Sequence, residues 1–163
     1  MKNILLVCTG NTCRSPMAET MLDSAVDESD ILDGIIKTDS AGTFAFEDGE
    51  PAQYAKMVMK EMGLSIDRHK AKQIDQDLVD WADLILAMDS YGLEQMQVMF
   101  PEAEDKLTLF KSFAKTGKIA VDEEDRDSIE DPYGEDLETY RECAEEIKRY
   151  VDKLVIILEE IHG

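Results

Sequence analysis

A cysteine and an arginine separated by five residues could together carry out nucleophilic chemistry on a phosphate group. Cys8 follows an apolar run, and Arg14 stands directly before Ser15 and Pro16. A thiolate is a strong nucleophile, and a guanidinium offers a planar fork of donors to phosphate oxygens. A lone cysteine after an apolar run is usually a buried hydrophobe. This spacing favours a reactive cysteine instead, because both residues belong to a strand-to-helix turn.

The elements on either side of this turn would hold the two residues in place. Ile4–Val7 is an apolar, branched run that predicts a buried strand. Ser15 and Pro16 form a helix start signal, with a hydroxyl cap and a proline at the first helical position, and the helix extends to about Val26. Helix N-terminal amides favour anions. The small residues between strand and helix could turn their amides around a phosphate: Thr9, Gly10, Asn11, Thr12 and Cys13.

Strand and helix patterns alternate along the rest of the chain. Further strands are predicted at Ile35–Ser40, Leu84–Met88 and Lys106–Phe110, and helices at 51–62, 76–81, 89–99 and from Glu135 to Ile161. Such alternation predicts an α/β fold with a four-stranded parallel sheet in the order 2-1-3-4. Helices would cover both faces as a three-layer sandwich, with residues 1–163 as one domain. Residues 111–130, with an acidic run at 122–127, are expected to be irregular.

Composition limits the cellular setting and the partners. The chain has 163 residues, and 17 basic against 37 acidic residues give a net charge of −20. Such a surface repels nucleic acids and anionic membranes, so neither is an expected partner. No apolar run is long enough for a signal peptide or a membrane span, so we expect a cytoplasmic protein. Three cysteines do not suggest a disulfide scaffold, and the sequence predicts no metal site and no cofactor.

The segment from Cys8 to Pro16 resembles the phosphate loop of the low-molecular-weight protein tyrosine phosphatases. A second segment, Asp131-Pro132-Tyr133-Gly134, matches their general-acid loop, and the resemblance extends from Asn3 to about Leu158. It implies that Cys8 forms a phosphocysteine intermediate. It also implies that Arg14 and the loop amides bind the phosphoryl oxygens.

The resemblance assigns supporting roles to further residues. Ser15 would hydrogen-bond the sulfur of Cys8, and Ser40, Asn11 and His69 would form a network behind the loop. Cys8 and Cys13 would be able to form a reversible disulfide, which protects the nucleophile from irreversible oxidation.

The remaining assignments concern the leaving group and the walls of the site. Expulsion of the leaving group requires a proton, and a carboxylate can later activate water, so Asp131 is assigned both steps. Phe46 and Tyr133 would form aromatic walls of the substrate pocket.

Thr12 leaves two substrate classes open. Many tyrosine-specific members carry a branched apolar residue at this position, whereas threonine is a mark of the related bacterial protein-arginine phosphatases. The aromatic residues Phe46 and Tyr133 favour phosphotyrosine, which is the substrate we expect from the sequence, with phosphoarginine as the alternative. The expected partners are therefore phosphorylated proteins or peptides, and inorganic phosphate is the expected product.

Two other activities of similar loops fit the sequence less well. Arsenate reduction requires additional redox cysteines near the third strand, and residues 78–99 contain none. A phosphocysteine carrier of sugar transport would need neither Asp131 nor Arg14 at these positions.

Overall fold

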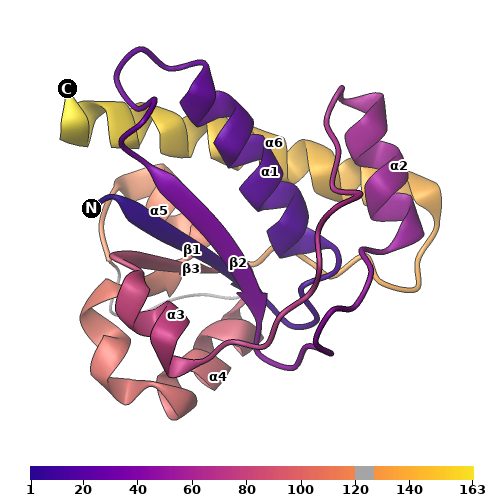
Figure 1. The fold of residues 1–163 in the computed structure, drawn as a ribbon, viewed down its shortest axis with the longest axis horizontal. Helices are drawn as coiled ribbons and strands as arrows, with labels where there is room; N and C mark the ends of the chain where they lie inside the picture. The colour runs from indigo at the N-terminus through magenta and orange to yellow at the C-terminus, as the bar shows by residue number, and fades with distance from the viewer. Residues whose placement is uncertain (120–126) are drawn as a thin grey trace.

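Four parallel strands form the centre of the molecule (Figure 1). The computed structural model describes residues 1–119 and 127–163. The strands are β1 (Asn3–Cys8), β2 (Lys37–Gly42), β3 (Leu84–Ala87) and β4 (Leu107–Leu109), and they lie in the order β2-β1-β3-β4. The register pairs Cys8 with Gly42 at the carboxyl edge of the sheet. The predicted strand order is therefore confirmed.

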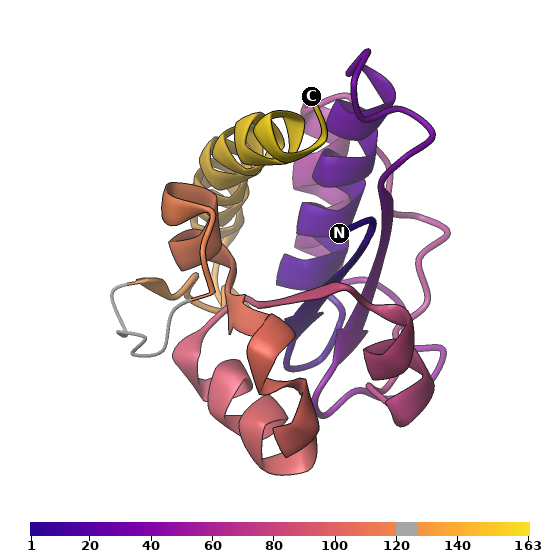
Figure 2. The same cartoon turned by 90° about the vertical axis from the view of Figure 1, so that its left-hand side faces the viewer.

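Helices cover both faces of this sheet, which confirms the three-layer arrangement (Figure 2). One face packs against α1 (Arg14–Asp27), α2 (Gln53–Glu61), α5 (Phe110–Thr116) and α6 (Leu137–His162). The other face packs against α3 (Gln76–Trp81), α4 (Ser90–Met99) and the 3-10 helix η1 (Pro101–Lys106). β1 alternates between the two cores, with Ile4 and Leu6 on one side and Leu5 and Val7 on the other.

The prediction of an irregular segment after the fourth strand is partly wrong. β4 ends at Leu109, and Phe110 begins α5 rather than ending the strand. Phe110, Phe113 and Ala114 are buried at the spacing of one helix face. Gly117 ends the helix in the left-handed region, with a φ of +70°. The acidic run lies outside the described residues, apart from Asp127.

The starts of β2 and α1 also differ from the prediction. β2 begins at Lys37 rather than Ile35. Helix α1 begins at Arg14, and Ser15 does not cap it, because the Ser15 hydroxyl is directed to the sulfur of Cys8. This apparent cap signal is therefore part of the site.

The long amphipathic helix at the end of the chain is confirmed as α6. Asp136 caps it by accepting a hydrogen bond from the amide of Thr139 at 2.9 Å. Its apolar side, which includes Tyr140 and Ile147, packs on α1, α2 and α5. Within the described part of the chain, no helix has the length and apolarity needed to cross a membrane.

Candidate active site

A cavity of about 480 Å3 opens where the loop after β1 meets the loops that follow β2 and precede α6. Most of the residues that sequence analysis placed in the site line this cavity: Cys8, Thr9, Gly10, Thr12, Cys13, Arg14, Phe46, Asp131 and Tyr133. Asn11, Ser15, Ser40 and His69 do not line it and lie behind the loop. The side chain of Asn11 therefore supports the loop instead of facing the cavity.

Three carbonyl groups of the loop after β1 accept hydrogen bonds from neighbouring backbone amides. Those of Cys8 and Thr9 accept hydrogen bonds from the amides of Thr43 and Phe44, each at 2.9 Å. The carbonyl of Thr12 accepts from the amide of Ala52 at 3.0 Å. Because these carbonyls already have partners, the loop amides are the backbone groups available to bind an anion, as in other anion-binding turns before a helix.

Arg14 is the buried cation of the site, with 1% of its surface exposed. Its Nη1 donates to Asp89 Oδ2 at 2.5 Å and to the carbonyl of Ile129 at 2.9 Å, and its Nη2 lies 3.5 Å from Asp131 Oδ2. Burial by itself would lower the pKa of Arg14, but the neighbouring negative groups at Cys8, Asp89 and Asp131 raise it overall. The guanidinium therefore stays charged.

One donor of Arg14 remains unsatisfied. Nε is buried, and no partner for it exists among the residues that the structure describes. A buried polar atom without a partner is costly, unless a ligand supplies one. Since Arg14 lines the cavity beside Cys8, an oxygen of a bound phosphoryl group would satisfy this donor.

A chain of hydrogen bonds connects Cys8 to a carboxyl group in α1. The hydroxyl of Ser40 donates to Glu19 Oε1 at 2.6 Å, and Asn11 Nδ2 donates to Ser40 Oγ at 3.0 Å and to Ser15 Oγ at 2.9 Å. The oxygen of Ser15 is thus an acceptor for Asn11. Its own proton is free to point toward Cys8 Sγ, which lies 2.9 Å away, so the Ser15 hydroxyl can donate to this sulfur.

Asn11 adopts a left-handed backbone conformation, with a φ of +56°. Three neighbours stabilise it: His69 Nε2 contacts the Asn11 carbonyl at 2.7 Å, the amide of Lys72 donates to Asn11 Oδ1 at 3.0 Å, and Gly42 packs beside it. A carbonyl only accepts, so His69 Nε2 carries a proton. A Cβ atom at Gly42 would overlap the carbonyl oxygen of Thr9. The predicted positions of Ser40 and His69 behind the loop agree with this geometry.

Cys13 is buried at the floor of the cavity, and its sulfur lies 3.4 Å from the hydroxyl of Tyr140. Burial raises the pKa of the Cys13 thiol, and the hydrogen bonds with Tyr140 and Thr12 oppose this in part. Cys8 and Cys13 are both free thiols in this structure, so their reversible disulfide stays a prediction.

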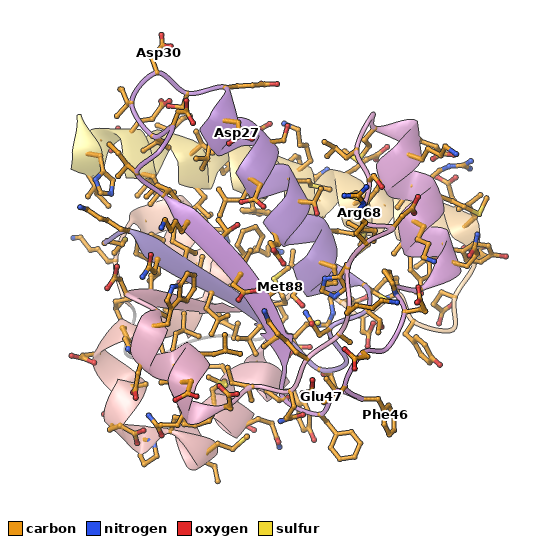
Figure 3. The ribbon with its side chains drawn as sticks, viewed as in Figure 1. Asp27, Asp30, Phe46, Glu47, Arg68 and Met88 are labelled. Carbon is orange, nitrogen blue, oxygen red and sulfur yellow. The ribbon has the colours of Figure 1, made fainter. Side chains whose placement is uncertain are left out.

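The rim of the cavity is aromatic and acidic. Phe44, Phe46 and Tyr133 each expose more than 70% of their surface, and Phe44 packs edge to face against Phe46. Figure 3 shows Phe46 projecting outward from the loop after β2. Asp131 sits on the opposite loop, where its Oδ1 accepts a hydrogen bond from the amide of Tyr133 at 3.1 Å.

Three contributors to this site were not predicted from the sequence. Asp89 was expected only to begin a helix, although a carboxylate directly after β3 stands at the carboxyl edge beside β1, where ligands bind in such sheets. Nothing in the sequence marked Glu19 as a residue of the site, because it is one polar position among others in a helix. Phe44 was given no role. The described residues contain no group of three or more His, Cys, Asp or Glu side chains arranged to hold a metal ion.

The model of the family described as low molecular weight phosphotyrosine protein phosphatase matches residues 3–162. This chain belongs to that family. The phosphatase is 41% identical to the protein-arginine-phosphatase of Geobacillus stearothermophilus over 151 residues, which cover 93% of this chain and 92% of that protein. It is 32% identical to the low molecular weight protein-tyrosine-phosphatase of Streptomyces coelicolor over 164 residues, covering 98% and 96% of the two chains.

Solved structures of this family have the same fold. The YwlE arginine phosphatase from Geobacillus stearothermophilus superimposes with a TM-score of 0.85 at 37% identity, covering 99% of this phosphatase and 95% of that chain. A low molecular weight protein tyrosine phosphatase from T. tengcongensis gives a TM-score of 0.81 at 38% identity, covering 96% and 99%. Fold and family are therefore established, and both substrate classes occur among the relatives.

The hydrogen-bond chain behind the loop predicts a pH-dependent stability. Burial raises the pKa of Glu19 from 4.5 to about 7, although the Ser40 hydroxyl opposes this. Between these values the folded state holds a proton that the unfolded state releases, so stability is lost as the pH rises through 7. Glu19→Gln, which mimics the protonated form, should gain up to about 3 kcal/mol relative to the wild type between pH 4.5 and 8.

Urea unfolding of both proteins across this pH range measures the difference. Glu28→Gln, at an exposed position just after the same helix, provides the comparison for the loss of one negative charge. A constant difference in unfolding free energy between wild type and Glu19→Gln would contradict the prediction.

Proposed function

We propose that this phosphatase hydrolyses phosphoarginine in proteins, through a phosphocysteine intermediate at Cys8. The proposal rests on the position of Thr12. This residue lines the cavity and places a hydroxyl in the phosphate loop. A hydroxyl can accept a hydrogen bond from the N–H groups of a guanidinium, whereas the edge of a phenyl ring offers no such donor. The similarity to two protein-arginine-phosphatases, from Geobacillus stearothermophilus and Bacillus subtilis, further supports it.

This proposal reverses the order of the two substrates expected from the sequence. Phe46 and Tyr133 favoured phosphotyrosine there, but both rings are exposed at the rim and can also stack on a planar guanidinium. The aromatic walls therefore do not discriminate between the substrates. Thr12 lies in the phosphate loop itself, so we expect its hydroxyl to discriminate between the two substrates.

The first chemical step forms a sulfur–phosphorus bond and breaks the phosphorus–nitrogen bond. The thiolate of Cys8, stabilised by the Ser15 hydroxyl, attacks the phosphorus. The Arg14 guanidinium, including its buried Nε, and the loop amides stabilise the charge on the phosphoryl oxygens. Asp131 in its protonated form gives a proton to the departing nitrogen, so that arginine leaves as a guanidinium.

The second step returns the enzyme to its starting state. Asp131, now a carboxylate, removes a proton from a water molecule as that water attacks the phosphocysteine. The phosphorus–sulfur bond breaks, inorganic phosphate is released, and Cys8 leaves as a thiolate. The half-exposed Asp131 side chain, 46% accessible, can reach both the leaving group and a water molecule at the mouth of the cavity.

Substitutions of Thr12 test the substrate class. Thr12→Val removes the hydroxyl at nearly constant shape, and Thr12→Ser keeps it. In peptides that differ only in the phosphorylated residue, Thr12→Val should reduce kcat/KM on phosphoarginine about tenfold or more, as expected for a lost hydrogen bond to a charged group. Thr12→Ser should retain the preference of the wild type for phosphoarginine.

The proposal fails if the wild type has a higher kcat/KM on the phosphotyrosine peptide. The role of Thr12 fails separately if phosphoarginine is preferred and Thr12→Val leaves the ratio of the two substrates unchanged.

Asp131→Asn tests the proton transfers. Without the acid, kcat/KM on a phosphoarginine peptide should fall by about 10²–10⁴. p-Nitrophenyl phosphate has a leaving group that needs no proton, so it should still give a rapid burst of nitrophenolate, followed by slow turnover as water attack becomes limiting. Glu130→Gln is the control for a neighbouring carboxylate. Equal losses on both substrates, without a burst, would exclude Asp131 as the general acid.

A further inference from the structure

A second, smaller hollow adjoins the active-site cavity. Its volume is about 350 Å3, and Ala52 and Tyr133 line both spaces. We call it the tyrosine pocket; its other lining residues are Gln53, Tyr54, Gly134, Glu135 and Tyr140. A side chain close in sequence to a phosphorylated residue in the cavity can therefore reach this pocket across the shared wall.

Three aromatic rings from separate segments meet at the tyrosine pocket. Tyr54 in α2 and Tyr140 in α6 pack edge to face, with ring centroids 5.6 Å apart and an interplanar angle of 76°. Tyr140 is fixed at the base, because it is buried and its hydroxyl contacts the sulfur of Cys13. Tyr54 and Tyr133 expose 41% and 73% of their surfaces. Exposed aromatic rings gathered beside a site are typical of binding surfaces.

The charge of the pocket selects among possible occupants. Glu135 is its single charged lining residue among those the structure describes, and it stands in a turn closed by a hydrogen bond from its amide to the Pro132 carbonyl at 2.9 Å. The whole chain carries a net charge of −20. An anionic side chain would be repelled here, whereas a cationic one would be attracted to the exposed Glu135 carboxylate.

We propose that the tyrosine pocket binds a lysine or arginine side chain of the substrate protein, located near the phosphorylated residue in sequence. The cation would lie against the tyrosine rings and pair with the Glu135 carboxylate. Electron-rich ring faces attract cations, and several rings together form a cage for them. This inference rests on the proposed protein-phosphatase chemistry at Cys8, and it defines which substrate sequences are preferred.

The pocket also connects with the general-acid loop. Tyr133 lines the pocket, and its amide donates to Asp131 Oδ1. An occupant that packs on the Tyr133 ring therefore restrains the same turn that carries Asp131. We expect the bound cation to act on kcat/KM through substrate positioning.

The test uses a set of phosphoarginine peptides with an otherwise uncharged sequence. Lysine, norleucine or glutamate is placed in turn at each of four positions, namely the two residues before and the two residues after the phosphorylated residue. Norleucine matches the aliphatic stem of lysine without its charge. For the wild type, we expect lysine to exceed norleucine in kcat/KM by about fivefold at one position at least, as cation–π contacts would give. Glutamate should be the poorest residue there.

Variants assign the preference to the pocket. Within each variant, the ratio of kcat/KM for the lysine and norleucine peptides is compared, so that a general change in activity cancels. Tyr54→Leu and Glu135→Gln should each reduce this ratio toward one. Tyr54→Phe, which keeps the ring, should retain it. Glu145→Gln, which removes an exposed carboxylate that does not line the pocket, should retain it as well.

Two outcomes would overturn the proposal. Equal kcat/KM values for lysine and norleucine peptides in the wild type would mean that the pocket does not select a cation. A lysine preference that persists in both Tyr54→Leu and Glu135→Gln would assign it to the overall charge of the protein instead.

A parallel set of phosphotyrosine peptides separates this inference from the proposed function. If the enzyme turns over only phosphotyrosine, the phosphoarginine assignment fails, but the ratio of lysine to norleucine peptides in that set still tests the tyrosine pocket.

Discussion

The buried guanidinium of Arg14 is the constraint on which the site depends. A buried cation is stable only when charged and polar partners surround it. Here Asp89 after β3, the carbonyl of Ile129 and the carboxylate of Asp131 provide them. Arg14 therefore connects the loop after β1, the end of β3 and the segment before α6, and its Nε has no hydrogen-bond partner among the described residues.

Much of this arrangement could be predicted because its signals are local. The apolar run before Cys8 defines a buried strand, and the alternation of strands and helices leads to the sheet order β2-β1-β3-β4. In such a sheet the ligand binds beyond the carboxyl end of the central strand, where Cys8 lies. Asp131 and Tyr133 stand far from Cys8 in the sequence, and their placement relied on family resemblance. The structure brings both into the same cavity.

Local propensity did not reveal several features of the site and of the fold. Ser15 has the pattern of a helix cap, but its hydroxyl contacts the sulfur of Cys8, a competition that local propensity does not reveal. Glu19 joins the site through Ser40 on a neighbouring strand. Helix α5 was overlooked because strand β4 ends directly before it at Leu109. The sequence pattern alone did not determine the substrate class, because Thr12 and the aromatic residues Phe46 and Tyr133 suggested different substrates.

The proposed reaction depends on transfer of the phosphoryl group to Cys8. This transfer can be observed by quenching the Asp131→Asn enzyme in acid during turnover of p-nitrophenyl phosphate and locating the phosphate by peptide mass spectrometry. We expect one phosphoryl group on the peptide that carries Cys8, and none when Cys8 is replaced by alanine. A phosphoryl group on another residue, or an active Cys8→Ala enzyme, would contradict it.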